Sequence, residues 1–131
     1  MNPFKRIKIG DRILTMDCIV CFQVNRKSVH VGMSFDDEPS VFEGKEATLL
    51  LNHFEGQDRF IQARKGFFIN VDAITSVSLQ MGDDVLVWVA HEFVEPYHLK
   101  GDDAQRFWEQ YSERTDCLDL SILNKKSADR S

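Results

Sequence analysis

The amino-acid sequence predicts an α+β domain made of two copies of one ββββα-like unit. Three observations predict it: apolar residues alternate in strand-like fashion through most of each half, an apolar-striped helix closes each half, and the two halves align with each other. Asp17 aligns with Asp72 at a separation of 72 − 17 = 55 residues, and this separation grows by one residue at each of two turns. We expect copies at about 4–55 and 58–113, packed as one pseudo-two-fold domain, because a unit of that size buries little surface alone.

The first half reads as short strands followed by a helix. Strands are expected where apolar and polar residues alternate or β-branched residues gather, over residues 4–9, 12–16, 19–24, 29–33 and 40–43. The polar run 25–28 marks a hairpin turn, and the acidic run 36–39 marks a loop. A helix is expected over 45–54, where one apolar face recurs at helical spacing, formed by Ala47, Leu50, Leu51 and Phe54.

The second half repeats this order, with strands expected over residues 58–64, 67–71, 74–79, 85–90 and 93–99. The run 85–90 is almost continuously apolar, which is typical of a central strand, and Pro96 indicates a bent or edge strand. A helix is expected from Gly101, with an apolar stripe of Ala104, Phe107, Trp108 and Tyr111. We expect one domain over 1–114 and a partly disordered tail over 115–131, where four leucines and isoleucines lie among polar residues.

Composition limits the classes of function. The chain has 131 residues, a formal net charge of −5 and no apolar run long enough to cross a membrane. The first residues lack the apolar segment of a secretory signal, so a cytoplasmic protein is expected. A negative net charge opposes non-specific binding to nucleic acid, although a local basic face can still bind phosphates.

Catalysis, metal binding and cofactors are not expected. Cys18 and Cys21 form a CxxC, but they lie in a strand-like pattern, and a zinc site would need a second pair where only Cys117 remains. We interpret them as small buried hydrophobes. The spacing of the four histidines matches no metal-ligand motif; they are His30, His53, His91 and His98. The glycines are scattered along the chain and do not form a phosphate-binding loop.

Residues 60–74 resemble the signature of LytTR-type DNA-binding domains. Phe60, Ile61, Asn70 and Ile74 match it, and Arg64-Lys65-Gly66 stands where the family has a basic His-Arg-Ser-like step, with Arg64 replacing the histidine and Gly66 the serine. A late Ser-Arg element of the family has no clear equivalent at 97–100. The resemblance implies a DNA-binding role in which Arg64 and Lys65 are the contact candidates. Other cations that could widen this basic face are Lys5, Arg6, Lys8, Arg26, Lys27 and Arg59.

The leading interpretation is a non-enzymatic protein that docks on, and occludes, a protein partner. Its acidic loops would make the contact, through Asp36, Asp37, Glu38, Asp83 and Asp84. A small acidic chain of this kind suits a phage or mobile-element inhibitor of a host nucleic-acid machine, such as an anti-CRISPR protein. The alternative is a LytTR-like DNA-binding transcriptional regulator that uses Arg64 and Lys65. A third interpretation is a subunit that assembles into a homo-oligomer.

Overall fold

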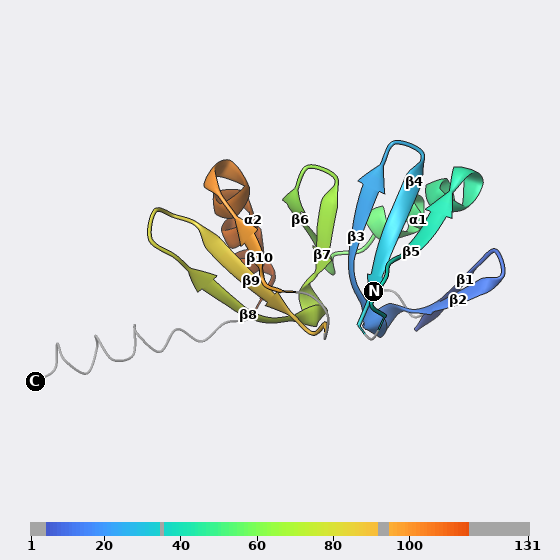
Figure 1. Ribbon diagram of the computed structural model, residues 1–131, viewed down its shortest axis with the longest axis horizontal. Helices are drawn as coiled ribbons and strands as arrows, with labels where there is room; N and C mark the ends of the chain where they lie inside the picture. Colours follow the sequence, from blue (N-terminus) through green and yellow to red (C-terminus); the bar gives the residue numbers. More distant parts are fainter. Residues whose placement is uncertain (1–4, 35, 92–94, 116–131) are drawn as a thin grey trace, which may run out of the picture.

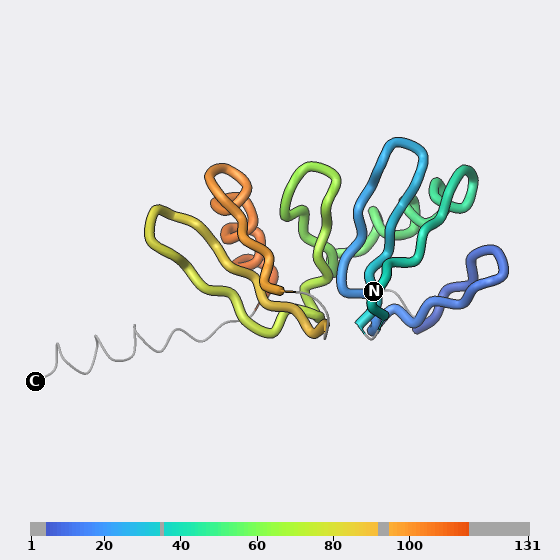
Figure 2. Tube along the Cα trace, viewed as in Figure 1, coloured from blue at the N-terminus to red at the C-terminus, as the bar shows by residue number. Residues whose placement is uncertain are grey.

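The computed structural model describes residues 5–34, 36–91 and 95–115, and these form an α+β fold of three antiparallel sheets and two helices. The sheets follow one another along the long axis of the molecule, with the five-stranded sheet in the middle (Figures 1 and 2). Strand order is β1-β2 in the smallest sheet, β5-β4-β3-β7-β6 in the middle sheet and β10-β9-β8 in the third. In chain order the elements are β1 (Arg6–Ile9), β2 (Arg12–Thr15), η1 (Met16–Cys18), β3 (Ile19–Asn25), β4 (Ser28–Met33), β5 (Ser40–Glu43), α1 (Gly44–Glu55), β6 (Phe60–Arg64), β7 (Phe67–Asn70), η2 (Val71–Ala73), β8 (Ile74–Leu79), β9 (Val85–Val89), β10 (Tyr97–Leu99) and α2 (Gly101–Arg114).

The middle sheet separates two hydrophobic clusters, because successive side chains of a strand point to opposite faces. Phe60 and Phe68 point into a first cluster with α1, whereas Ile61 and Ile69 point into a second cluster with α2 and β9. The hairpin β6–β7 of the second half pairs with β3 of the first half, so both halves build the sheet that lies between the clusters.

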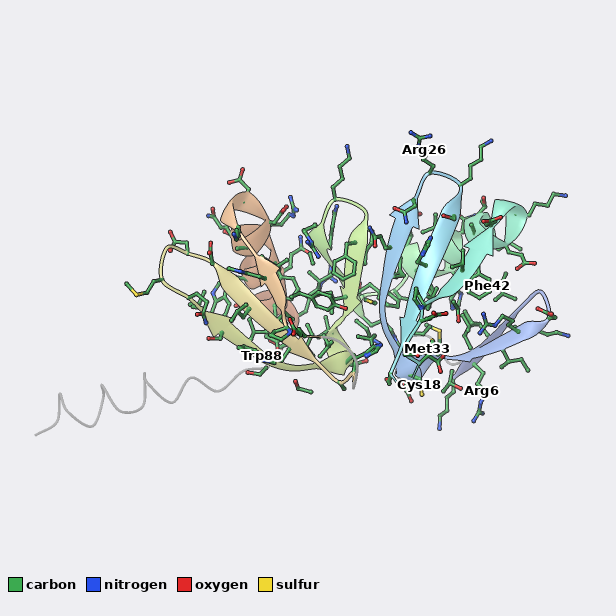
Figure 3. The ribbon with its side chains drawn as sticks, viewed as in Figure 1. Arg6, Cys18, Arg26, Met33, Phe42 and Trp88 are labelled. Carbon is green, nitrogen blue, oxygen red and sulfur yellow. The ribbon has the colours of Figure 1, made fainter. Side chains whose placement is uncertain are left out.

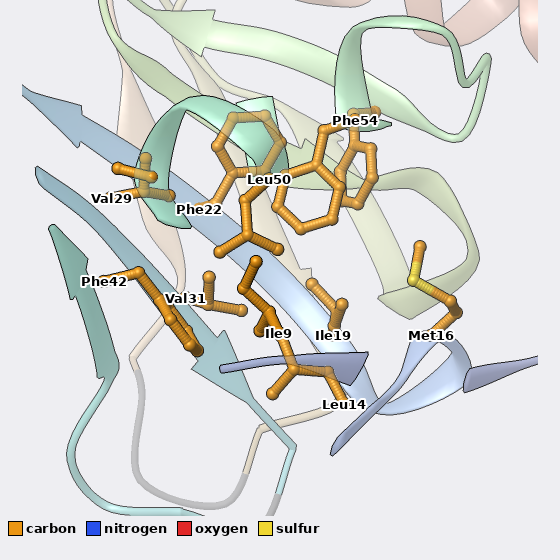
Figure 4. Close-up of a cluster of buried hydrophobic side chains, with 12 residues drawn as sticks. Ile9, Leu14, Met16, Ile19, Phe22, Val29, Val31, Phe42, Leu50 and Phe54 are labelled. Carbon is orange, nitrogen blue, oxygen red and sulfur yellow. The ribbon is translucent and has the colours of Figure 1, made fainter. Parts of the chain in front are cut away.

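Aromatic rings fill the first cluster (Figure 4). The Phe22 ring stacks on Phe54 and on Phe68, each at a centroid distance of 4.7 Å, and meets the edge of Phe60 at 4.9 Å. Helix α1 contributes Phe54 and Leu50, whose relative exposures are 1% and 2%. Full burial of such a side chain contributes about 1.5–3 kcal/mol, so the predicted apolar face of this helix is what holds it on the sheet.

Helix α2 closes the second cluster with Ala104 and Phe107, which are fully buried. Strand β9 is the middle strand of its sheet, which confirms the central position predicted from its apolar run. The Arg114 guanidinium donates hydrogen bonds to the carbonyl oxygens of Asp58 and Phe60, at 3.0 and 2.6 Å, and so ties the end of α2 to the start of β6.

The two halves share one order of elements: two strands, a 3-10 turn, three strands and a helix. Asp17 and Asp72 each lie in the middle of a 3-10 turn. Gly44 and Gly101 each begin a helix, with φ of +59° and +57°. These equivalences fit the alignment of the halves, and their origin by duplication stays a prediction.

Several predicted boundaries differ from the structure. The expected strand 12–16 ends at Thr15, and 67–71 ends at Asn70, because 3-10 turns begin at the next residues. The expected strand 93–99 is described only as β10, since 92–94 lie outside the described residues, as does the predicted tail from 116 onward. Among the described residues, no helix is long and apolar enough to cross a membrane.

Candidate functional site

Four turns lie along one edge of the molecule, at the top of the view in Figures 1 and 2. They connect β3 to β4, β5 to α1, β6 to β7 and β10 to α2. Two backbone hydrogen bonds hold the first three together: Val24 N donates to Gly66 O at 2.7 Å, and Gly44 N donates to Lys27 O at 3.2 Å. We term these turns the loop edge, which comprises residues 25–28, 43–45, 64–66 and 100–101.

The loop edge is strongly cationic although the whole chain has a formal net charge of −5. Its residues include six exposed cations and one carboxylate, Glu43, although Asp83 and Asp102 lie beside Gly101 at the β10–α2 turn. Within the part of the chain that the structure describes, none of the six is in an ion pair. Figure 3 shows one of them, Arg26, extending outward from the β3–β4 turn. The six are Arg26, Lys27, Lys45, Arg64, Lys65 and Lys100.

The N-terminal ends of both helices lie at the loop edge, where carboxylates of the first turns, Glu46 in α1 and Asp102 and Asp103 in α2, offset their positive potential. Helices α1 and α2 begin at Gly44 and Gly101, inside the loop edge, and no side chain of their N-cap residues Glu43 and Lys100 bonds the first turn. Each helix N-terminus carries the equivalent of about half a positive charge on its unpaired N–H groups. The side-chain cations of the turns, rather than the helix ends, are therefore the main attraction for an anion at this edge.

The β6–β7 turn holds its two cations in different environments. Gly66 has φ of +75°, and a Cβ at this position would lie 3.2 Å from Val24 O, so the backbone of the turn lies close against β3. The Arg64 guanidinium lies over the Phe67 ring, 5.1 Å from its centroid. Lys65 is exposed at the tip of the hairpin. Arg64 is thus oriented by packing, whereas Lys65 is free to extend into solvent.

Four of the cations expected to widen this face do not lie on the loop edge. Lys5, Arg6 and Lys8 lie in and beside β1, and Figure 3 shows Arg6 at the opposite edge of the molecule from Arg26. Arg59 lies 3.7 Å from the Asp17 carboxylate, beside the 3-10 turns. The remaining two, Arg26 and Lys27, are on the loop edge together with Lys45 and Lys100, which the sequence did not identify.

The two acidic loops lie in different sheets. Residues 36–38 are exposed between β4 and β5, at the end of β4 that lies away from the loop edge. Asp83 is exposed in the β8–β9 turn, where its φ is +65°. Asp84 is half-buried, and its carboxylate lies 3.0 Å from Nε2 of His98. These loops therefore do not form one acidic surface.

Three of the cysteines and histidines line one groove, Cys21, His30 and His91. Among the described residues, no group of three potential metal ligands is close enough to hold an ion. Cys21 is half-buried against the second cluster, and its Sγ lies 3.7 Å from the Tyr97 hydroxyl. Burial raises the pKa of the Cys21 thiol, which disfavours the reactive thiolate. Cys18 is half-buried at the end of η1.

Asn70, one of the residues that carry the family resemblance, has a structural role. Its side chain is fully buried; Nδ2 donates to Ile19 O at 2.7 Å, and Oδ1 accepts from Asp72 N at 3.0 Å. It thereby joins the start of β3 to the 3-10 turn η2, across the junction of the two halves. A side-chain amide, which can donate and accept at once, provides both of the hydrogen bonds at this junction.

No protein-family model matches the chain, and no curated protein matches it significantly by sequence. A solved structure does resemble it: the LytTr DNA-binding domain of a protein described as a methyl-accepting/DNA response regulator from Bacillus cereus. The two chains superpose with a TM-score of 0.53 at 14% identity, over 80% of this chain and 93% of that domain. This likeness supports the resemblance carried by residues 60–74. The chain therefore has the fold of a LytTr DNA-binding domain.

Proposed function

We propose that this protein binds double-stranded DNA through the loop edge and acts as a non-catalytic, DNA-binding regulator. The observation that carries the proposal is the gathering of six exposed cations on one edge of a fold shared with a LytTr DNA-binding domain. The turns that carry these cations come from both halves of the chain, and backbone hydrogen bonds join three of the four, so these three present a preformed surface.

The negative net charge of the chain does not oppose this proposal. Exposed charges more than about 10 Å apart are largely screened at 0.1 M salt. The binding of a phosphate at the loop edge therefore depends mainly on the cations near it. If all six cations displaced counterions, log K would fall with log salt with a slope of about −5. The salt dependence of binding thus reports how many of these side chains face phosphates.

The proposal is tested by fluorescence anisotropy of labelled duplex DNA, titrated with protein at several salt concentrations. The double variant Arg64→Glu/Lys65→Glu should lose most of the salt-sensitive binding. The single variant Lys27→Gln should reduce the slope by about one, as expected for the loss of one phosphate contact. Lys45→Gln and Lys100→Gln should do the same if the whole edge faces DNA.

Lys8→Gln is the matched control, because Lys8 is an exposed lysine on the β1–β2 hairpin and not on the loop edge. It should leave both affinity and slope close to those of the parent protein. Absence of binding at tens of micromolar protein in low salt would contradict the proposal, since even non-specific DNA binding is commonly detected at such protein concentrations. Equal losses in Lys8→Gln and Lys27→Gln would also contradict it.

The interpretation as an inhibitor that occludes a protein partner gains no support from these observations. The acidic residues expected to make the contact lie in two separate loops, and one of them, Asp84, is engaged by His98. The fold similarity concerns a DNA-binding domain and not an inhibitor of a nucleic-acid machine.

A further inference from the structure

A groove of about 450 Å³ lies beside the loop edge, between the middle sheet and β10. Its floor includes two aromatic rings, Phe67 and Tyr97, which meet edge to face at a centroid distance of 5.0 Å. Cys21 and Gly32 continue the floor along the sheet. A Cβ at position 32 would lie 2.9 Å from the Cys21 Sγ, so only glycine leaves this part of the floor open.

The ends of this groove carry opposite charges. Arg64 and Lys65 line it at the loop edge, and Asp37 and Glu38 line it from the β4–β5 loop. Strand pairing places Arg64 level with Gln23, and the β4–β5 loop lies beyond Gly32. Three residues of strand separate the two levels, which is about 10 Å along the strand direction. All four charged side chains are exposed, and none is in an ion pair within the described part of the chain.

This distribution of charge selects among ligand classes. A purely anionic ligand that filled the groove would meet the two carboxylates at its far end, and a purely cationic ligand would meet Arg64 and Lys65. A zwitterion with separated charges satisfies both ends at once. The aromatic floor between the ends suits an apolar side chain, and polar groups of Gln23 and His30 along the groove suit peptide amides.

We propose that this groove binds a short peptide with free termini. Its carboxylate pairs with Arg64 and Lys65, its ammonium group pairs with Asp37 and Glu38, and an apolar side chain rests on the half-buried Tyr97 ring, beside Phe67. An extended peptide spans about 3.3–3.6 Å per residue, so two to four residues, roughly, bridge the two charged ends. The proposal is independent of DNA binding, although Arg64 and Lys65 belong to both surfaces.

The test is isothermal titration calorimetry with a panel of Gly-Xaa-Gly tripeptides in which Xaa is Phe, Trp, Leu or Ser. Each peptide is used with free termini, with an acetylated N-terminus and with an amidated C-terminus. At least one apolar member should bind with a Kd below about 1 mM, a range that corresponds to about 4 kcal/mol. Capping either terminus should weaken that binding by about fivefold, the effect expected for loss of one exposed ion pair.

Variants of the groove locate each terminus. In Asp37→Asn/Glu38→Gln the free and acetylated peptides should bind alike, while amidation keeps its effect. In Arg64→Gln/Lys65→Gln the pattern should reverse. Asp11→Asn and Lys8→Gln, both on the β1–β2 hairpin, serve as matched controls and should behave like the parent protein, and thermal melting checks that every variant is folded. The proposal is overturned if no member of the panel binds below about 1 mM, or if capping weakens binding equally in the parent protein and both groove variants.

Discussion

Replacing Asn70 with alanine should destabilise the protein by about 3 kcal/mol, because two buried groups lose their hydrogen-bond partner. The side chain is fully buried and makes one bond to Ile19 O, at 2.7 Å, and one from Asp72 N, at 3.0 Å. The bond to Ile19 spans 51 residues of sequence, so it connects segments that are distant in the unfolded chain.

The magnitude follows from the fate of the two partners. A buried polar group left without a partner costs about 1–3 kcal/mol. Ile19 and Asn70 are both fully buried, so the Ile19 carbonyl would lose its partner without gaining water. Asp72 is exposed, so water can replace part of the second bond and reduce its cost to about 1 kcal/mol. For a domain of this size, about 3 kcal/mol corresponds to a fall in Tm of roughly 10 °C.

Urea unfolding followed by tryptophan fluorescence measures the change, with the m-value as a check that the extent of unfolding is the same. Asn70→Asp should be at least as destabilising, because a carboxylate keeps the acceptor for Asp72 N but places a negative charge against the Ile19 carbonyl. Asn52→Ala, an exposed position on α1, is the control and should change stability by less than about 0.5 kcal/mol. A loss below about 1 kcal/mol in Asn70→Ala, or greater stability of Asn70→Asp than of Asn70→Ala, would refute the assigned bonding.

Four further measurements test other parts of the structure. Gly66→Ala should cost about 1–2 kcal/mol in urea unfolding, because alanine at a φ of +75° is strained and its Cβ crowds Val24 O. Burial raises the pKa of Tyr97 above its ordinary value of 10.0, so its phenol should not titrate near pH 10 in ultraviolet difference spectra. Stability should accordingly fall as the pH rises above about 10, where only the unfolded chain releases this proton. Arg114→Ala should destabilise by about 1–3 kcal/mol in urea unfolding through loss of both hydrogen bonds to β6. If both proposals hold, a tripeptide bound in the groove should weaken DNA binding in the anisotropy assay, because both ligands use Arg64 and Lys65.

The sequence predicted an element well where its apolar residues recur at regular spacing and turn residues mark its ends. Strand β5 and strand β8 have the predicted bounds, and both helices cover their predicted apolar stripes. It did not predict the 3-10 turns at Asp17 and Asp72, because these short turns depend on hydrogen bonds that the spacing of apolar residues does not reveal. The pairing of β3 with β7 was also beyond prediction, because strand periodicity marks a buried face without naming the neighbouring strand.

The candidate site was only partly predictable for a related reason. Arg64 and Lys65 came from a local resemblance, but Lys45 and Lys100 are isolated lysines beside glycines at helix starts. Nothing in the linear sequence shows that these four turns share one edge. The acidic loops, by contrast, were conspicuous in the sequence because their charges are contiguous, and the structure places them apart.

Charge is segregated by the alternation of turns in the middle sheet. Antiparallel strands place successive connections at opposite ends, so the β3–β4 and β6–β7 turns face the loop edge while η1, η2 and the β4–β5 loop lie at the other end. The first set carries four of the six loop-edge cations, Arg26, Lys27, Arg64 and Lys65; the second carries Asp17, Asp72 and the acidic residues 36–38. The net charge of −5 averages over these two ends and hides their difference. If the loop edge binds DNA as proposed, the phosphate backbone would be attracted to one end of the sheet and repelled from the other, and this would orient the protein on a duplex before any base is contacted.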